Sequence, residues 1–170
     1  MKIIGIALVF AVAAGLVVTG QTSVDAKLQA QLKRLFPSAA SFSPKEGSPP
    51  HFKVYSSGKT LSGYAFFTTE LVPLERGYDG PIRQLVGMDM NGVLTGIVVV
   101  EHNEPYGNFS VDTRGFVDQF VGKSIRDPFK VGGDIDAISR ATISVTSASR
   151  AVRNSARRIA REFLTPAAVQ

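Results

Sequence analysis

The chain has 170 residues, a hydrophobic content of 44% and a net charge of +5, which allows one domain of ordinary size plus a short extra segment. It contains no cysteine and only two histidines. Structural disulfides, thiolate metal sites and iron–sulfur clusters are therefore excluded, and an imidazole zinc site is poorly supplied. Any redox chemistry would need an imported cofactor.

An uncharged apolar run from Ile3 to about Gly20 opens the chain. A helix of this length, at about 1.5 Å per residue, approaches the ~30 Å hydrocarbon core of a bilayer. Two interpretations stay open, a cleaved signal peptide and an uncleaved anchor. We expect residues 1–22 to be this signal peptide or membrane anchor. Residues 23–170 would then fold on the periplasmic side of the inner membrane, anchored or secreted.

Residues 25–36 are predicted to form a helix, because leucines recur on one side of it and Pro37 ends it. A loop rich in Ser, Pro and Gly follows, and the pattern then changes to the period of strands. Residues 51–56 and 61–69 are predicted to form a first pair of strands joined by a turn.

Residues 81–89 and 94–101 are predicted to form a second pair of strands. The dipeptide Asn91-Gly92 lies between them and favours a tight hairpin, since both residues tolerate positive φ. The β-branched run at residues 98–100 indicates a strand in the centre of the sheet.

A short helix is predicted over residues 113–122, and a long helix over residues 145–164 has an apolar stripe. The expected fold class is therefore α+β, an antiparallel sheet flanked by helices and preceded by the N-terminal apolar helix. The opposite side of the long helix is either a solvated surface or a docking face for anionic lipid or an acidic redox partner. Export argues against nucleic acid as the partner. The arginines on that side are Arg150, Arg153, Arg157 and Arg161.

The run from Asp136 to Thr142 places a carboxylate and two hydroxyls just ahead of the long helix. One interpretation is that its polar residues are ordinary turn and cap residues. The other is a phosphate site, because free N–H groups and the positive end of the helix dipole favour an anion at a helix start. A threonine hydroxyl at that point could also be esterified to the phosphate.

Several other segments place this run in a wider pattern. Taken in order, the set resembles the FMN-binding domain family, found in the sodium-pumping quinone reductases and the Rnf complexes. It resembles most closely the periplasmic flavin domain of the NosR/NirI-type regulators of nitrous oxide and nitrite reduction, which implies a denitrification-related role. The segments are Phe36-Pro37, Gly47–Pro50, Gly63-Tyr64, Gly77–Asp89, Glu101–Pro105 and Asp136–Thr142.

The resemblance implies FMN as the cofactor, joined through its phosphate to Thr142 by a phosphoester bond. A separate flavin transferase would make this bond from FAD with the help of magnesium, and Asp136 would serve recognition by that transferase. Tyr78 either stacks on the flavin or packs as a half-buried residue. The further cofactor-binding residues that we expect are Ser139, Arg140, Ala141, Glu104 and Tyr78. No catalytic residue and no metal ligand is expected.

Two positions depart from the family pattern. Arg140 stands where the family usually has glycine, which would permit a positive φ that arginine adopts only at a cost. An arginine could instead offer a charged fork to the phosphate. The loop Glu104–Gly107 also differs from the commoner Thr-Pro-Gly form, and we expect it near the flavin ring.

The expected function is that of an exported flavoprotein electron carrier rather than a self-standing enzyme. It would pass electrons between a membrane quinol-oxidising or iron–sulfur protein and a periplasmic acceptor. One alternative is a non-redox flavin- or partner-binding module that serves regulation or assembly at the membrane. Another is a structural domain held to the membrane by its N-terminal helix and its basic face.

Overall fold

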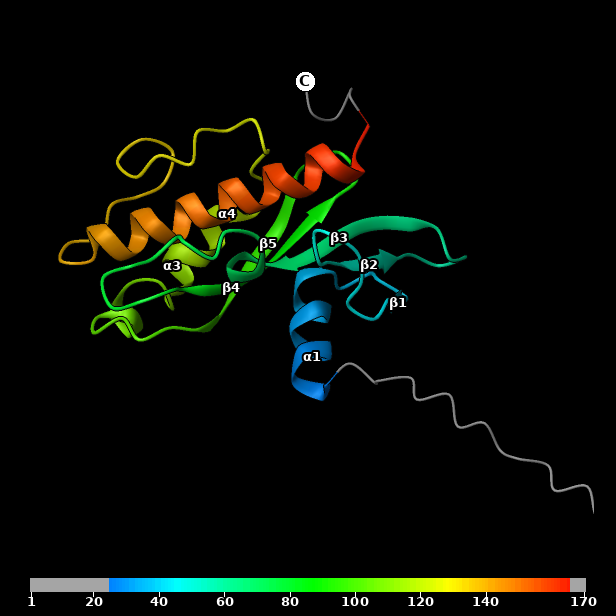
Figure 1. Cartoon of the computed structure of the whole chain (residues 1–170), viewed down its shortest axis with the longest axis horizontal. Helices are drawn as coiled ribbons and strands as arrows, with labels where there is room; N and C mark the ends of the chain where they lie inside the picture. Colours follow the sequence, from blue (N-terminus) through cyan, green and yellow to red (C-terminus); the bar gives the residue numbers. More distant parts are fainter. Residues whose placement is uncertain (1–24, 166–170) are drawn as a thin grey trace, which may run out of the picture.

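A computed structural model describes residues 25–165 of the chain, and these residues build an α+β fold on one antiparallel sheet (Figure 1). The predicted signal or anchor segment, residues 1–22, lies outside the described residues. Within residues 25–165, none of the helices combines the length and the hydropathy that a membrane span requires.

The sheet has five strands that follow one another in space in the order of the chain. Every neighbouring pair is antiparallel, so the sheet is a meander. Both predicted strand pairs are confirmed, with ends that shift by one or two residues. The strands are β1 (Ser41–Phe42), β2 (Phe52–Tyr55), β3 (Leu61–Phe67), β4 (Arg83–Asp89) and β5 (Leu94–Glu101).

Helices cover both faces of the sheet, α1 on one and α4 on the other (Figure 1). Side chains along β4 alternate between the two cores: Leu85 packs on the α1 side, whereas Val86 and Met88 pack on the α4 side. The helical segments are α1 (Ala26–Leu35), α2 (Thr68–Leu71), η1 (Gly107–Phe109), α3 (Arg114–Val117), η2 (Asp118–Phe120) and α4 (Thr142–Phe163).

Strand β5 is an edge strand, so the prediction that residues 98–100 lie in the centre of the sheet is wrong. Its β-branched residues reflect burial on both faces, because Ile97 packs into the α4 core and Val98 into the α1 core. The segment after η2 covers the start of the free edge of β5. Leu94 N–H donates to Lys123 O at 2.7 Å, and Gly122 N–H donates to Leu94 O at 2.8 Å.

The hairpin between β4 and β5 is organised by Asp89. Its Oδ1 accepts hydrogen bonds from Asn91 N–H at 2.8 Å and Val93 N–H at 2.9 Å, which is an Asx-type turn. Only Gly92 of the Asn-Gly pair has a positive φ, of 76°. The turn is therefore not the two-residue hairpin expected from the dipeptide.

Helix α4 begins at Thr142, three residues before the predicted start. Its predicted apolar stripe is confirmed, because Ala148, Val152, Ala156 and Ile159 are fully buried. Residues 136–141 form the approach to this helix, so the run that carried the phosphate hypothesis ends on the first helical turn.

Candidate functional site

A hollow of about 470 Å³ lies at the start of α4, within the range of roughly 300–1,000 Å³ that is usual for small-molecule sites. Three separate segments contribute to it, the loop before β4, the loop after β5 and the first turn of α4. These segments meet at one end of the molecule (Figure 1). The lining residues are Tyr78, Pro105, Tyr106, Arg140, Ala141, Thr142, Ile143 and Ser144.

Thr142 is the first residue of α4, and its side chain is exposed at the hollow. The residue before it, Ala141, is the N-cap and offers no side-chain hydrogen bond. The first N–H groups of a helix lack partners within the helix. Here no cap side chain occupies them, and the positive end of the dipole faces the same place. Thr142 is therefore not a cap, and the site can receive an anion beside its hydroxyl.

Arg140 adopts a φ of 66°. This is the left-handed conformation that glycine adopts without strain, and glycine is the residue that the resemblance implies at this position. The backbone thus follows the course expected for glycine although the side chain is arginine. Ser139 and Asp136 are both located on the same approach, with Asp136 exposed, and Asp136 N–H donates to Gln119 Oε1 at 2.7 Å.

Exposed apolar side chains line the hollow together with Thr142. Tyr78 is 70% exposed, Tyr106 54% and Ile143 58%. The alternative in which Tyr78 is a half-buried packing residue is therefore wrong. Large exposed apolar groups gathered on one hollow are typical of a surface that a ligand or partner covers, and flat aromatic rings suit a planar ligand.

Glu104 is buried and joins all three segments of the site. Its Oε2 accepts from Tyr78 N–H and its Oε1 from Asp79 N–H, both at 3.0 Å. The Ser144 hydroxyl donates to Oε2 from the third residue of α4. The carboxylate thus contacts the chain rather than the hollow, and a direct flavin contact by Glu104 stays a prediction.

Two glycines allow the loops to approach so closely. A Cβ on Gly77 would lie 2.4 Å from Glu104 Oε1, and a Cβ on Gly107 would lie 1.9 Å from His102 Cε1. The His102 ring is itself held on both nitrogens. Its Nδ1 accepts from Glu104 N–H at 3.0 Å, so its Nε2–H donates to Asp112 Oδ2 at 2.9 Å.

A second carboxylate ties the loop before β4 to α4. The Glu75 carboxylate accepts hydrogen bonds from Arg150 Nε at 2.8 Å and from Arg150 Nη2 at 2.6 Å. It also accepts one from the Ser147 hydroxyl at 3.1 Å. The hydrogen bond from Arg150 is the largest cause that lowers the pKa of Glu75 below its ordinary value. Ser144, Ser147 and Arg150 follow one another at intervals of three, which places them along one face of the helix.

The arginine side of α4 is largely used within the molecule. Arg157 donates to Ile125 O at 2.8 Å and to Asp127 O at 2.9 Å. Arg153 and Arg158 likewise donate to backbone carbonyls, those of Pro128 and Leu71. These three side chains fasten the loop of residues 125–128 and the end of α2 to the helix. Arg150 and Arg161 are exposed on the same helix, so a solvated surface and a docking face both stay predictions.

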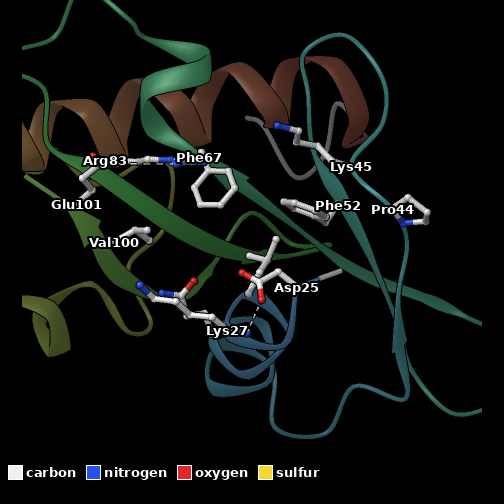
Figure 2. A pocket seen from close by; sticks show the side chains of 11 residues that line it. Asp25, Lys27, Pro44, Lys45, Phe52, Phe67, Arg83, Val100 and Glu101 are labelled. Carbon is white, nitrogen blue, oxygen red and sulfur yellow. Dashed lines mark hydrogen bonds and ion pairs between the residues drawn. The ribbon is translucent and has the colours of Figure 1, made fainter. Parts of the chain in front are cut away.

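A larger hollow, of about 670 Å³, lies on the α1 side of the sheet. Figure 2 shows Phe52 and Phe67 on its floor, with Lys45 on one side and Lys27 on the other. The guanidinium of Arg83 lies 4.1 Å from the centre of the Phe67 ring. None of the residues predicted to hold FMN lines this hollow, so it is separate from the candidate site.

Sequence reasoning missed several residues of the site. Ile143 carries a usable signal, since it is a large apolar residue beside the predicted site residue Thr142 in a polar stretch. Tyr106 lies in the loop of residues 104–107 that the sequence already places near the flavin ring. The role of Ser144 and Ser147 has a weaker signal, their helical spacing to Arg150. Nothing in the local sequence indicates that Glu104 and Glu75 accept the hydrogen bonds of these two serines.

Comparison with known proteins gives a consistent picture. Residues 77–157 match the family described as FMN-binding domain. The chain is 31% identical over 163 residues to the G subunit of the ion-translocating oxidoreductase complex of Methanosarcina acetivorans, covering 84% of each protein. It is 35% identical over 120 residues to the protein of the same name from Haemophilus influenzae, covering 64% of this chain and 54% of that protein.

A third relative is the G subunit of the Na(+)-translocating ferredoxin:NAD(+) oxidoreductase complex of Acetobacterium woodii. It is 29% identical over 106 residues, which cover 58% of this chain and 51% of that protein. The matches thus span about half the length of the Haemophilus and Acetobacterium proteins. The matched family segment, residues 77–157, contains the whole hollow around Thr142.

Proposed function

The chain belongs to the FMN-binding domain family that includes these oxidoreductase subunits, and from that premise we propose that it is an electron carrier with FMN attached to Thr142. FMN is the cofactor of the family. The phosphoester bond to Thr142 and the transfer of electrons on the periplasmic side of the membrane are the parts that we propose.

The position of Thr142 carries the proposal. The hydroxyl is exposed at the start of a 22-residue helix with no side-chain cap, beside a hollow of about 470 Å³. A phosphate attached there would meet free N–H groups and the positive end of the helix dipole. The exposed rings of Tyr78 and Tyr106 offer a surface for the flavin ring.

The attachment step balances with FAD as donor. A bond forms between Thr142 Oγ1 and the phosphorus of the FMN half, and the pyrophosphate bond of FAD breaks. AMP leaves with the electron pair, and the hydroxyl proton is released. A threonine hydroxyl is a weak nucleophile at its ordinary pKa, so we assign the step to a separate flavin transferase with magnesium. We keep recognition by that enzyme as the role of Asp136, which is exposed and six residues from Thr142.

The bound FMN supplies the capacity to accept and release electrons, and the chain supplies position and electrostatics. The sequence contains no cysteine, so an iron–sulfur cluster that exchanges electrons with the flavin would take its thiolate ligands from outside these 170 residues. The relatives are named as subunits of oxidoreductase complexes. By analogy we propose a membrane-bound quinol-oxidising or iron–sulfur partner and a periplasmic acceptor, with the N-terminal segment at the membrane.

The test is co-expression of the exported chain with a flavin transferase, followed by a denaturing gel and intact-mass analysis. We expect yellow, fluorescent protein that gains the mass of one FMN on the peptide bearing Thr142. Thr142→Ala should remove the label. Thr146→Ala, four residues along the same helix, is the matched control and should keep it. Label that persists in Thr142→Ala excludes this attachment site.

The same material separates the carrier from the non-redox binding module. A carrier is reduced and reoxidised reversibly while the flavin stays bound, and it exchanges electrons with membranes that contain its partner. Flavin that is attached but is not reduced by any membrane fraction of the source cells would favour the regulatory or assembly module.

A further inference from the structure

Glu104 combines deep burial with negative charge and no cationic partner. The residue is 6% exposed, and the three donors to its carboxylate are two backbone N–H groups and one hydroxyl. Within residues 25–165, no lysine, arginine or histidine forms an ion pair with it. All three donors point at carboxylate oxygens, which suits the ionised form because that form accepts only.

The carboxylate also lies beside the proposed flavin site. Ser144, which donates to it, lies two residues after Thr142 and lines the hollow. Tyr78, whose N–H donates to it, contributes an exposed ring to the same hollow. A charge that is shielded from water acts on its neighbours through a low dielectric, so its effect on a bound group is larger than at the surface.

We propose that Glu104 is a positioning residue that fixes the loop of Tyr78 to the first turn of α4, and that its uncompensated charge lowers the reduction potential of FMN bound beside Thr142. This inference rests on the proposed function. Electrons added to a flavin add negative charge to the ring, and a fixed anion nearby opposes that addition. The two parts of the role, position and charge, are separable by substitution.

Glu75 is the natural control, because it fastens the same loop to the same helix. Its charge is neutralised by Arg150 through two hydrogen bonds of 2.8 and 2.6 Å. Glu104→Gln removes an unpaired buried charge, whereas the double substitution Glu75→Gln/Arg150→Gln removes both halves of an ion pair and leaves the net charge unchanged. Both changes loosen the contact between the loop before β4 and α4, but only the first removes a negative charge that has no cationic partner.

The experiment measures the midpoint potential of the FMN-loaded full chain by redox titration. We expect Glu104→Gln to shift the potential upward and the charge-conserving Glu75→Gln/Arg150→Gln variant to shift it clearly less. Equal shifts in the two variants, or none in Glu104→Gln, would overturn the assignment of charge. A wild-type chain that gains no FMN would instead contradict the proposed function, so the two failures are distinct.

Hydrogen exchange on the flavin-free chain tests the positioning role. The amides of Tyr78 and Asp79 should exchange faster in Glu104→Gln than in the wild type, because each donates to Glu104. Unchanged exchange at both amides overturns this part. Ser144→Ala supplies a second test that does not depend on the folding of Glu104→Gln. It removes one donor and keeps the charge, so a rise in its potential would contradict the electrostatic account.

Discussion

Arg150 forms a two-pronged ion pair with Glu75, with Nε–Oε2 and Nη2–Oε1 distances of 2.8 and 2.6 Å. The two residues are 75 positions apart in the chain. Their contact, together with the hydrogen bond from Ser147, joins the loop that carries Tyr78 to the middle of α4. The geometry of the site therefore depends on a contact that lies outside the hollow.

Removal of this ion pair should lower the free energy of unfolding. Arg150 is about half exposed, so we expect a coupling energy of about 1 kcal/mol between Glu75→Ala and Arg150→Ala in a double-mutant cycle. Urea unfolding measures it. Arg161→Ala, at an exposed position on the same helix, should change stability by less than about 0.5 kcal/mol. Additive effects of the Glu75 and Arg150 substitutions would show that the pair contributes nothing.

The contribution of Glu75 should depend on pH. Its pKa in the folded protein is lowered from the ordinary value of 4.5, chiefly by the hydrogen bond from Arg150. The unfolded state therefore binds more protons between the two pKa values, and stability rises with pH there. The difference in free energy of unfolding between wild type and Glu75→Gln should be largest at neutral pH. It should decline below about pH 4.5, as the carboxyl of the folded protein takes up its proton.

Urea unfolding at a series of pH values from about 7 to about 3 checks this prediction, because this range covers the titration of an ordinary carboxyl group. The difference between wild type and Arg161→Ala is the control and should stay flat across the series. A difference between wild type and Glu75→Gln that also stays flat would show that the carboxylate gains nothing from its partners in the folded state.

The clearance at Gly77 gives a steric prediction. A Cβ there would lie 2.4 Å from Glu104 Oε1 and 2.9 Å from Ile82 Cδ1. Gly77→Ala must therefore displace the buried carboxylate, at a cost of about 1–3 kcal/mol, and it should reduce flavin attachment. Gly115→Ala is the matched control, because a Cβ on Gly115 meets nothing within 4 Å. Equal stability of the two variants, measured by urea unfolding, would contradict the packing described for Glu104.

Local patterns predicted the helices and strand pairs well, because each pattern reports the burial of one face. Helix α1 and the apolar stripe of α4 follow the period of their apolar residues. The same logic misplaced β5. Residues 98–100 are β-branched because both faces of the strand are covered, and a pattern of side chains carries no information on which edge has a neighbour.

The site was predictable only where its chemistry is local. The run from Asp136 to Thr142 contains the helix start, and its hydroxyl and small residues indicate a phosphate site. Glu104 differs, because its partners Tyr78 and Asp79 lie 26 and 25 residues away and offer backbone N–H groups, which leave no mark in the sequence. A glutamate in a polar loop is most often a surface residue, and burial here is a product of the tertiary fold.

The conformation of Arg140 leads to the last prediction. A φ of 66° costs an L-residue about 1–2 kcal/mol, and glycine avoids that cost but loses about 0.5–1 kcal/mol more conformational entropy on folding. Arg140→Gly should therefore raise the free energy of unfolding by about 0.5–1 kcal/mol. Arg140→Ala keeps the strain, so it should leave stability within about 0.5 kcal/mol of the wild type.

Flavin attachment should be as complete in Arg140→Gly as in the wild type, since the backbone already follows the course that glycine favours. The arginine that departs from the family pattern then strains the approach to α4 without misplacing Thr142. Intact-mass analysis after co-expression with the transferase measures the labelled fraction. A lower fraction in both Arg140→Gly and Arg140→Ala would instead assign the guanidinium a direct contact with the phosphate, the charged fork that arginine can offer to such a group.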